Sequence, residues 1–228
     1  MEKAFTPKII ARIRTDFPAK FGIPRQSGLV PLLEGRIVFE PEYRNPDALR
    51  GIEGYSHLWL IWLFSEAMID KWSPTVRPPR LGGNERMGVF ATRSPFRPNP
   101  IGLSCVKLER IERTGEGDVL IVSGADMMDG TPILDIKPYL AYADAIPDAR
   151  GGFTDTAARR YLKVVMPDAL PDGLSGEKAS ALRGVLSEDP RPRYQSDPDR
   201  VYGFVFSGYE VKFSVSDGVL TVKDITKV

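Results

Sequence analysis

An arginine-rich loop over residues 77–104 carries the side chains of this chain that are best suited to bind an anion. Its positive charge comes from Arg77, Arg80, Arg86, Arg93 and Arg97. Glu85 is its one acidic residue, so the local charge is +4. Prolines at positions 95, 98 and 100 restrict the backbone and reduce the entropy lost on binding. A planar guanidinium binds phosphate or carboxylate in a bidentate manner, so the loop favours anion recognition; a structural crossover with solvated arginines stays open.

A second candidate lies in the polar residues of the segment 128–139. If this segment is a strand, Asp135, Lys137 and Tyr139 share one face because side chains alternate along a strand. The opposite face is apolar and holds Leu134, Ile136 and Leu140. An acid, an amine and a phenol on one face form either a polar surface strip or one wall of a polar site.

Two further loops have a composition suited to binding. Residues 24–28 form a short polar loop. Arg191, Arg193 and Tyr194 follow Asp189 and a proline, so a second proline-fixed basic loop offers an aromatic ring that could stack on a nucleobase.

The single histidine and single cysteine exclude several kinds of site. One cysteine permits no disulfide within the chain, and one cysteine with one histidine cannot form a Cys/His zinc site, so no metal is expected. A Ser-His-Asp triad would require His57 as the base. Because His57 alternates with Trp59 and Ile61 in an apolar run, we interpret it as a core residue, and Cys105 likewise.

The overall composition is that of a soluble globular protein. The 228 residues are 42% hydrophobic and 27% charged, with a net charge of +1. That near-neutral total combines the basic loop with residues 109–155, where ten acids and four bases give −6. No apolar run approaches the roughly 20 residues of a membrane helix, and no signal segment is visible, so a cytoplasmic protein without a membrane segment is expected.

These side chains must be positioned by a mainly β fold. Short apolar runs between prolines and glycines predict strands at residues 7–14, 35–39, 55–64, 88–92, 101–110, 119–124 and 133–139. The run 55–64 is apolar on both faces and is interpreted as a buried central strand. The spacing favours a closed or nearly closed sheet, because closure removes exposed edges.

The composition changes near residue 142, which predicts a second, smaller domain. We expect a first domain over residues 1–145 and a small α+β domain over residues 146–228. The second domain should contain a helix at 175–188 and strands at 157–166, 202–206, 210–214 and 220–225. Asp217-Gly218 indicates a hairpin turn between the last two strands. No G-x-G-x-x-G motif supports a Rossmann cofactor site.

The run Phe-Ala-Thr-Arg-Ser-Pro-Phe-Arg-Pro-Asn-Pro-Ile-Gly at residues 90–102 resembles the signature of the TsaA/YaeB (TrmO) family. These are S-adenosylmethionine-dependent methyltransferases that act on N6 of threonylcarbamoyl-adenosine at position 37 of tRNA. Further matching segments are 24–26, 56–59, 77–84, 129–132, 135–139, 189–192 and Tyr194. The resemblance covers nearly the whole chain and is closest to the longer, bacterial form of the family.

The resemblance implies a single-sheet β-barrel that is not of the Rossmann type, and a homodimer with the cofactor near the subunit interface. The implied cofactor contacts are Pro24, Arg25, Gln26, Arg93, Leu103, Asp129, Gly130 and Thr131. A further contact falls at Ser65 and Glu66, where other members carry His-Gln, so this chain departs from the family at those side chains.

The implied reaction also assigns catalytic and RNA-binding residues. Methyl transfer requires N6 to lose a proton, which Asp135 or Tyr139 could accept with Lys137 beside them. Asn99, displayed by the arginine loop, is placed with them as catalytic. The anticodon loop of tRNA is expected to contact Arg77, Arg80, Arg86, Arg97, Arg191, Arg193 and Tyr194.

Three alternatives remain open from the sequence. The chain could be a non-catalytic RNA-binding barrel that uses the arginine loop for phosphates. It could be an S-adenosylmethionine-binding regulator without transfer. It could be a hydrolase with His57 as base, which needs Ser56 or Ser65 as nucleophile, although Ser56 is expected on the opposite strand face.

Overall fold

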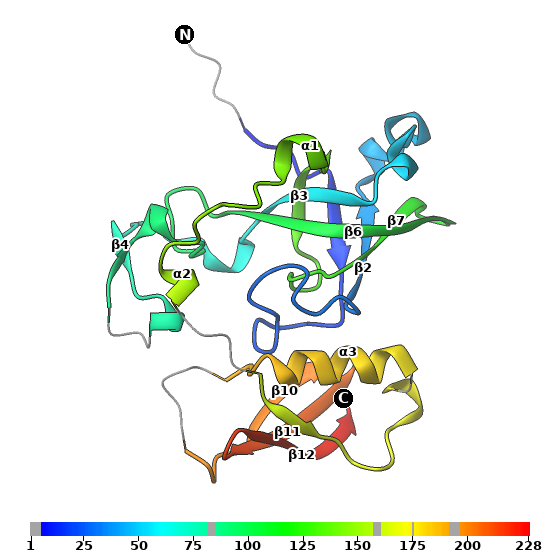
Figure 1. Cartoon of the computed structure of the whole chain (residues 1–228). Helices are drawn as coiled ribbons and strands as arrows, with labels where there is room; N and C mark the ends of the chain where they lie inside the picture. Colours follow the sequence, from blue (N-terminus) through cyan, green and yellow to red (C-terminus); the bar gives the residue numbers. More distant parts are fainter. Residues whose placement is uncertain (1–5, 82–84, 157–160, 175, 192–196) are drawn as a thin grey trace.

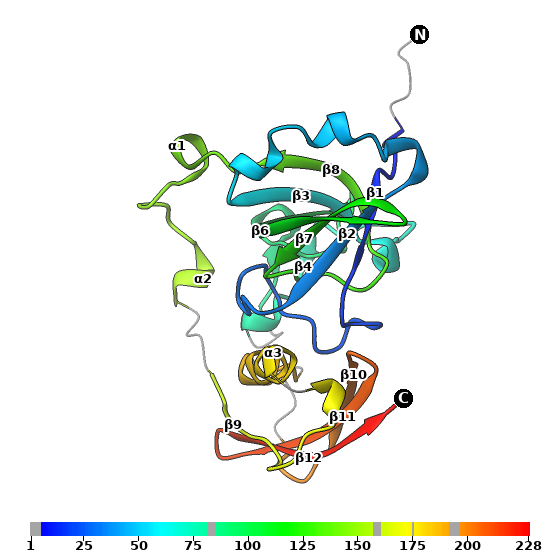
Figure 2. The same cartoon turned by 90° about the vertical axis from the view of Figure 1, so that its right-hand side faces the viewer.

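The computed structural model describes residues 6–81, 85–156, 161–174, 176–191 and 197–228. Figure 1 shows a first sheet that carries the N-terminal half of the chain and a smaller C-terminal sheet beneath it, with helix α3 (Gly176–Ser187) lying between the two. In Figure 2, the linking segment with α1 (Ala141–Asp144) and α2 (Phe153–Thr156) runs down one side toward the C-terminal sheet. Within the described ranges, no helix is long and apolar enough to span a membrane.

The first sheet consists of six antiparallel strands that close on themselves. They are β1 (Ala11–Arg14), β2 (Glu34–Phe39), β3 (His57–Leu63), β6 (Ile101–Thr114), β7 (Gly117–Ser123) and β8 (Pro132–Pro138). Their order is β1-β2-β7-β6-β3-β8, and pairing of Arg12 with Pro132 joins the last strand to the first as a closed barrel. The prediction of a mainly β chain is confirmed.

Closure decides which side chains enter the core, because only one face of each strand points into a barrel. Along β3, Leu58, Leu60 and Trp62 are buried, whereas His57 and Trp59 are partly exposed. The interpretation of this run as a strand buried on both faces is therefore wrong, and so is the interpretation of His57 as a core residue. Both residues belong to the outer face.

A β-bulge interrupts the alternation of β8. Ile61 pairs with Asp135, but the next residue, Trp62, pairs with Ile133, so Leu134 is the extra residue. Ile133 is fully buried and Ile136 packs against the same core. The prediction that Leu134 shares a face with Ile136 is therefore wrong, because the bulge shifts the alternation by one residue.

A long segment, residues 64–100, which we call the excursion, connects β3 to β6, and its two ends lie next to each other. The backbone amide of Phe64 donates a 2.8 Å hydrogen bond to the carbonyl of Pro100, which closes the neck of residues 64–100. The excursion contains the short strands β4 (Thr75–Val76) and β5 (Met87–Gly88), which pair with each other. The predicted strand at 88–92 is wrong beyond Gly88. Thr92 bonds the carbonyl of Val89 through both its amide and its hydroxyl, which stabilises a 3-10 turn there.

The C-terminal sheet has the order β10-β11-β12-β9. Its strands are β9 (Lys163–Val165), β10 (Tyr202–Phe206), β11 (Tyr209–Ser216) and β12 (Val219–Lys227). The hairpin predicted at Asp217-Gly218 is confirmed, since both residues have positive φ, 50° and 76°, and Ser216 pairs with Val219. The predicted strand at 157–166 is reduced to β9; its first four residues lie outside the described part of the chain.

The segment between β1 and β2 connects the two sheets. Phe17, Val30 and Leu33 belong to the core of the C-terminal sheet and α3, not to the barrel core. The rings of Phe17 and Phe206 are 5.3 Å apart, and Lys178 of α3 forms a 2.5 Å ion pair with Asp16. The boundary between the two cores therefore does not fall at a single point in the sequence. Residues 15–33 join two barrel strands but pack against the C-terminal sheet and α3.

Candidate functional site

One end of the barrel gathers the loops that carry the expected cofactor residues. β3 ends where β6 and β8 begin, since Leu63 pairs with Ile101 and Trp62 with Ile133, and β1 also ends there. The loops 15–33, 64–100 and 124–131 consequently all emerge from this end, which we call the site end. The strand order therefore brings residues 24–26, 65–66, 93 and 129–131 to the same end of the barrel.

A direct contact joins two of these loops. Arg93 Nη1 donates a 2.5 Å hydrogen bond to Gln26 Oε1, across 67 positions of sequence. The Arg93 side chain is exposed, and this contact occupies one of the five guanidinium N–H donors. A fixed and exposed guanidinium of this kind can bind a carboxylate or a phosphate.

A largely buried acid lies behind this contact. Asp126 Oδ1 accepts a 2.6 Å hydrogen bond from Ser104 Oγ, which itself accepts a 2.9 Å bond from Trp62 Nε1. Burial raises the pKa of Asp126 to about 6, although the bond from Ser104, backbone amides and the charge of Arg93 act in the opposite direction. Asp126 is not among the site residues expected from the sequence; the available signal was a lone acid between the apolar residues Ala125 and Met127.

The loop 24–28 is held against the barrel on two sides. Ser27 Oγ accepts a 3.1 Å hydrogen bond from the backbone amide of Cys105, and the amide of Gly28 donates to the carbonyl of Gly124 over 2.9 Å. Gly28 has φ of 75°, and a Cβ at Gly124 would lie 3.2 Å from the Gly28 backbone. Two glycines therefore permit the close approach that sets the position of Pro24, Arg25 and Gln26.

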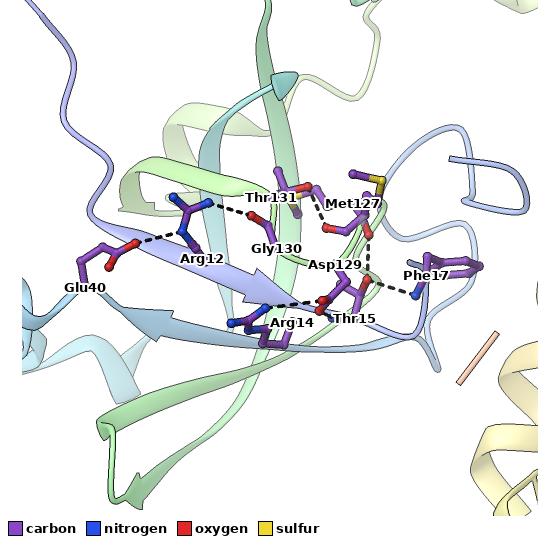
Figure 3. Close-up of polar contacts among 10 residues, drawn as sticks. Arg12, Arg14, Thr15, Phe17, Glu40, Met127, Asp129, Gly130 and Thr131 are labelled. Carbon is purple, nitrogen blue, oxygen red and sulfur yellow. Dashed lines mark hydrogen bonds and ion pairs between the residues drawn. The ribbon is translucent and has the colours of Figure 1, made fainter. Parts of the chain in front are cut away.

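The turn before β8 is fixed by its polar contacts with β1, as Figure 3 shows. Asp129 Oδ1 accepts a 3.0 Å bond from the Thr15 amide, and its other oxygen lies 3.5 Å from Arg14 Nη1. Arg12 Nη1 donates to the carbonyl of Gly130 over 3.2 Å. The Asp129 carboxylate nevertheless stays partly exposed at the site end.

Thr131 and Leu103, two other expected cofactor residues, differ from Asp129 in burial. Thr131 is buried, and its hydroxyl donates a 2.7 Å bond to the carbonyl of Met128, so this side chain stabilises the turn. Leu103 lies on the outer face of β6 with its side chain exposed. Ser65 and Glu66 form a 3-10 turn at the end of β3, where the carbonyl of Glu66 accepts a 2.7 Å bond from Lys20 Nζ.

The candidate catalytic side chains of β8 are spread along the barrel. Asp135 and Lys137 form a 2.8 Å ion pair, opposite Ile61 and Trp59 of β3. Tyr139 lies just past the strand, and its ring is 5.8 Å from that of Trp59. At about 3.3 Å per residue, Tyr139 is about 13 Å farther from the site end than Asp135. The strand therefore places Asp135 nearer to the site end than Tyr139.

Ser56 and His57 are in contact, which the sequence did not predict. Ser56 Oγ lies 2.9 Å from His57 Nδ1, because Ser56 precedes β3 and is not held on the opposite strand face. Among the described residues, no carboxylate hydrogen-bonds to His57. The pair also lies at the end of β3 away from the site end. Within the same ranges, no group of three or more His, Cys, Asp and Glu side chains is placed to hold a metal ion.

Four of the arginines expected to contact RNA lie on the excursion, and the side chains of three of them, Arg77, Arg86 and Arg97, are described. Arg77 and Arg86 are exposed, and Arg86 donates a 3.2 Å bond to Thr75 Oγ1. Arg97 donates a 3.3 Å bond to the carbonyl of Thr92. Asn99 is also exposed, at the neck of the excursion.

The C-terminal basic loop is described only in part. Arg191 forms a bidentate ion pair with Asp189, at 2.8 and 3.0 Å, which raises the pKa of the guanidinium. Only 14% of its side chain is exposed, so the guanidinium of Arg191 is engaged in a contact within the chain. Arg193, Tyr194 and the side chain of Arg80 lie outside the described residues.

The fold and site define a β-barrel protein with a polar, arginine-bearing loop cluster at one end. Residues 12–145 match the family model of the tRNA-methyltransferase O N-terminal domain, and residues 166–228 match that of the TrmO C-terminal domain. The chain belongs to the TrmO family. The resemblance inferred from the sequence is confirmed.

Relatives match over most of the chain. The tRNA (adenine(37)-N6)-methyltransferase of Escherichia coli is 41% identical over 216 residues, covering 91% of this chain and 92% of the relative. A putative S-adenosylmethionine-dependent methyltransferase RcsF of Pseudomonas aeruginosa is 45% identical over 201 residues, covering 85% of each chain. A crystal structure of TrmO from Pseudomonas aeruginosa superposes with a TM-score of 0.81 at 34% identity, covering 100% of this chain and 99% of that one.

Proposed function

We propose that this chain is an S-adenosylmethionine-dependent tRNA (adenine-N6)-methyltransferase that methylates threonylcarbamoyl-adenosine at position 37 of tRNA. The observation that carries the proposal is the contact of Arg93 with Gln26, which joins the two loops that the family signature marks. Relatives that match 85% or more of the chain are named as a methyltransferase of adenine 37 or as a putative S-adenosylmethionine-dependent methyltransferase.

The residues of the site end suit the charges of the cofactor. S-adenosylmethionine supplies an electrophilic methyl group on a sulfonium and carries an amino acid end. The free donors of Arg93 fit its carboxylate, and the partly exposed Asp129 and the exposed Glu66 fit its ammonium group. Pro24, Gln26 and Leu103 would complete the cofactor site. Thr131 would contribute by holding the turn in shape.

For the chemistry, the chain has to position two reactants and accept one proton. The N6 nitrogen attacks the methyl carbon in line as the carbon–sulfur bond breaks, and the N6 proton is transferred to a base. We assign that base to Asp135, because it lies nearer to the site end than Tyr139 and carries Lys137 at 2.8 Å. Asn99, exposed at the neck, would orient the base of the substrate.

Binding of tRNA and of a second copy are further parts of the proposal. Arg77, Arg86 and Arg97 of the excursion would bind phosphates of the anticodon loop. A first domain over residues 1–145 would carry the catalytic site and residues 146–228 would help to recognise tRNA in the cytoplasm. Large apolar side chains are exposed on the excursion and on β6, at Met68, Trp72, Phe90, Phe96, Ile101 and Leu103. A homodimer that covers this surface accounts for them.

The test is methyl transfer to tRNA that lacks the modification. Purified protein, methyl-labelled S-adenosylmethionine and tRNA carrying unmethylated threonylcarbamoyl-adenosine are incubated, and the nucleosides are analysed by mass spectrometry. We expect a single added methyl on N6, and its loss in Arg93→Ala. Binding of both ligands without any transfer would instead support a non-catalytic binding protein, and labelling of another nucleoside would contradict the substrate assignment.

A further inference from the structure

We infer that Asp126 is the residue that positions the cofactor loop and Arg93 relative to each other. This inference rests on the proposed function, since it assigns the loop 24–28 to cofactor binding. Asp126 is largely buried and is not assigned to direct contact with the cofactor or the RNA. Its role is to hold the groups that make those contacts.

Three separate parts of the chain meet at this carboxylate. Ser104 of β6 donates to Oδ1 at 2.6 Å, and the next residue, Cys105, donates its amide to Ser27 Oγ at 3.1 Å, one residue after Gln26. The backbone amide of Ser27 also lowers the pKa of the carboxylate. Arg93 of the excursion acts on it through its positive charge. A single acid thus connects the barrel wall, the cofactor loop and the arginine that Gln26 contacts.

The site end is built to keep this carboxylate in place. Ser104 is itself buried and accepts the indole N–H of Trp62, so its hydroxyl proton is directed at Asp126. The ring of Trp62 lies against Gly102, where a Cβ would come within 2.2 Å of it. Gly102 thus lets the buried ring lie close to β6, where its N–H reaches Ser104 and Ser104 in turn reaches Asp126.

An ionised acid in this place has a direct effect on the loop. A largely buried carboxylate is costly unless donors and positive charge offset its burial, and here Ser104 donates to it while the Ser27 amide and Arg93 favour its charged form. Asn keeps an acceptor oxygen at this position, so the change removes only the charge that attracts the Ser27 amide and Arg93. The carboxylate would then no longer hold Gln26 and Arg93 in position relative to each other. This change should weaken cofactor binding, whereas β8 keeps its position.

The experiment measures cofactor affinity and turnover separately in Asp126→Asn. We expect the dissociation constant for S-adenosylmethionine, measured by calorimetry, to rise about tenfold. The KM for the cofactor should rise in parallel, whereas kcat at saturating cofactor and the KM for tRNA stay within twofold of wild type. Ser104→Ala, a milder change, should raise the same dissociation constant by a smaller factor, and the effects of the two substitutions should be less than multiplicative.

Asp118→Asn is the matched control. Asp118 is also a partly buried barrel acid, paired with Arg113 at 3.2 Å, but it lies at the hairpin of β6 and β7 away from the site end. It should leave cofactor affinity unchanged. Unchanged affinity in both Asp126→Asn and Ser104→Ala, or a loss of kcat without a loss of affinity, would overturn the inference. Failure of the wild-type protein to bind the cofactor would instead overturn the proposed function.

Discussion

Arg25 donates a hydrogen bond from its guanidinium to the backbone carbonyl of Arg191 over 3.3 Å. This bond joins the loop expected to bind the cofactor to the end of the segment that follows α3. Together with Phe17 and Val30 in the C-terminal core, it supports the loop from the side opposite the barrel. The C-terminal sheet therefore contributes to the shape of the site end.

Substitution of the phenylalanine beneath this loop should affect both stability and cofactor binding. Phe206 is fully buried and packs edge-on against Phe17. We expect Phe206→Ala to reduce the free energy of unfolding by about 3–5 kcal/mol in urea titrations. It should also weaken binding of S-adenosylmethionine, because residues 15–33 lose their anchor. Tyr142→Ala, at a side chain that is 88% exposed, is the control and should change neither.

The close approach of Gly102 to Trp62 gives a second prediction. A methyl group at Gly102 would overlap the indole ring, so Gly102→Ala should destabilise the protein by about 1–3 kcal/mol. Gly54→Ala is the comparison, since nothing lies within 4 Å of its Cβ position and its φ is not positive. Its unfolding midpoint in urea should be equal to wild type or higher. Equal midpoints for both variants would contradict the packing described here.

The stability difference between wild type and Asp126→Asn should depend on pH. Burial raises the pKa of Asp126 from 3.8 to about 6 in the folded protein, against the positive charge of Arg93, which lowers it. Folding thus favours the protonated acid; this contribution is complete below pH 4 and is lost as pH rises through 6. The difference in unfolding free energy should change by about 2.4 kcal/mol between pH 4 and 7.5, to the disadvantage of wild type at the higher pH. A difference that stays constant over this range would contradict the burial of an ionisable acid there.

Salt dependence distinguishes phosphate contacts from other roles of the excursion arginines. If Arg86 and Arg97 each bind a phosphate, replacing either by alanine should weaken tRNA binding. It should also reduce the slope of log K against log salt by about 0.7. Arg113→Ala, at an exposed arginine of the distant β6–β7 hairpin, should leave the slope unchanged. An unaltered slope for Arg97→Ala removes its assignment to a phosphate.

The two candidate bases make opposite predictions for turnover. Asp135→Asn should lower kcat by about 10²-fold or more if it accepts the N6 proton. Tyr139→Phe should keep kcat close to wild type, because Tyr139 lies toward the other end of β8. Normal turnover in both variants would exclude this strand as the source of the base. His57→Ala should also remain active, and loss of turnover there would revive a role for the contact of His57 with Ser56.

The sequence predicted those strands and turns that depend on neighbouring residues. It did not predict the features that depend on contacts between segments far apart in the chain. β10 was predicted with its observed bounds, and the turn at Asp217-Gly218 follows from two residues that tolerate positive φ. The exposure of His57 could not be predicted, since it depends on closure of the barrel, which leaves each strand one outer face. Asp126 was missed for the same reason, because its partners come from segments that are far apart in sequence.

The neck formed by Phe64 and Pro100 allows the length of the excursion to change independently of the barrel. Since β3 and β6 are paired up to the neck, the 37 residues beyond Leu63 can lengthen or shorten without altering the strand register. The entropy of closing such a loop grows only slowly with its length. Changes within this one segment that leave Ser65, Glu66 and Arg93 in place can thus alter the surface it presents while the barrel and the expected cofactor residues stay the same.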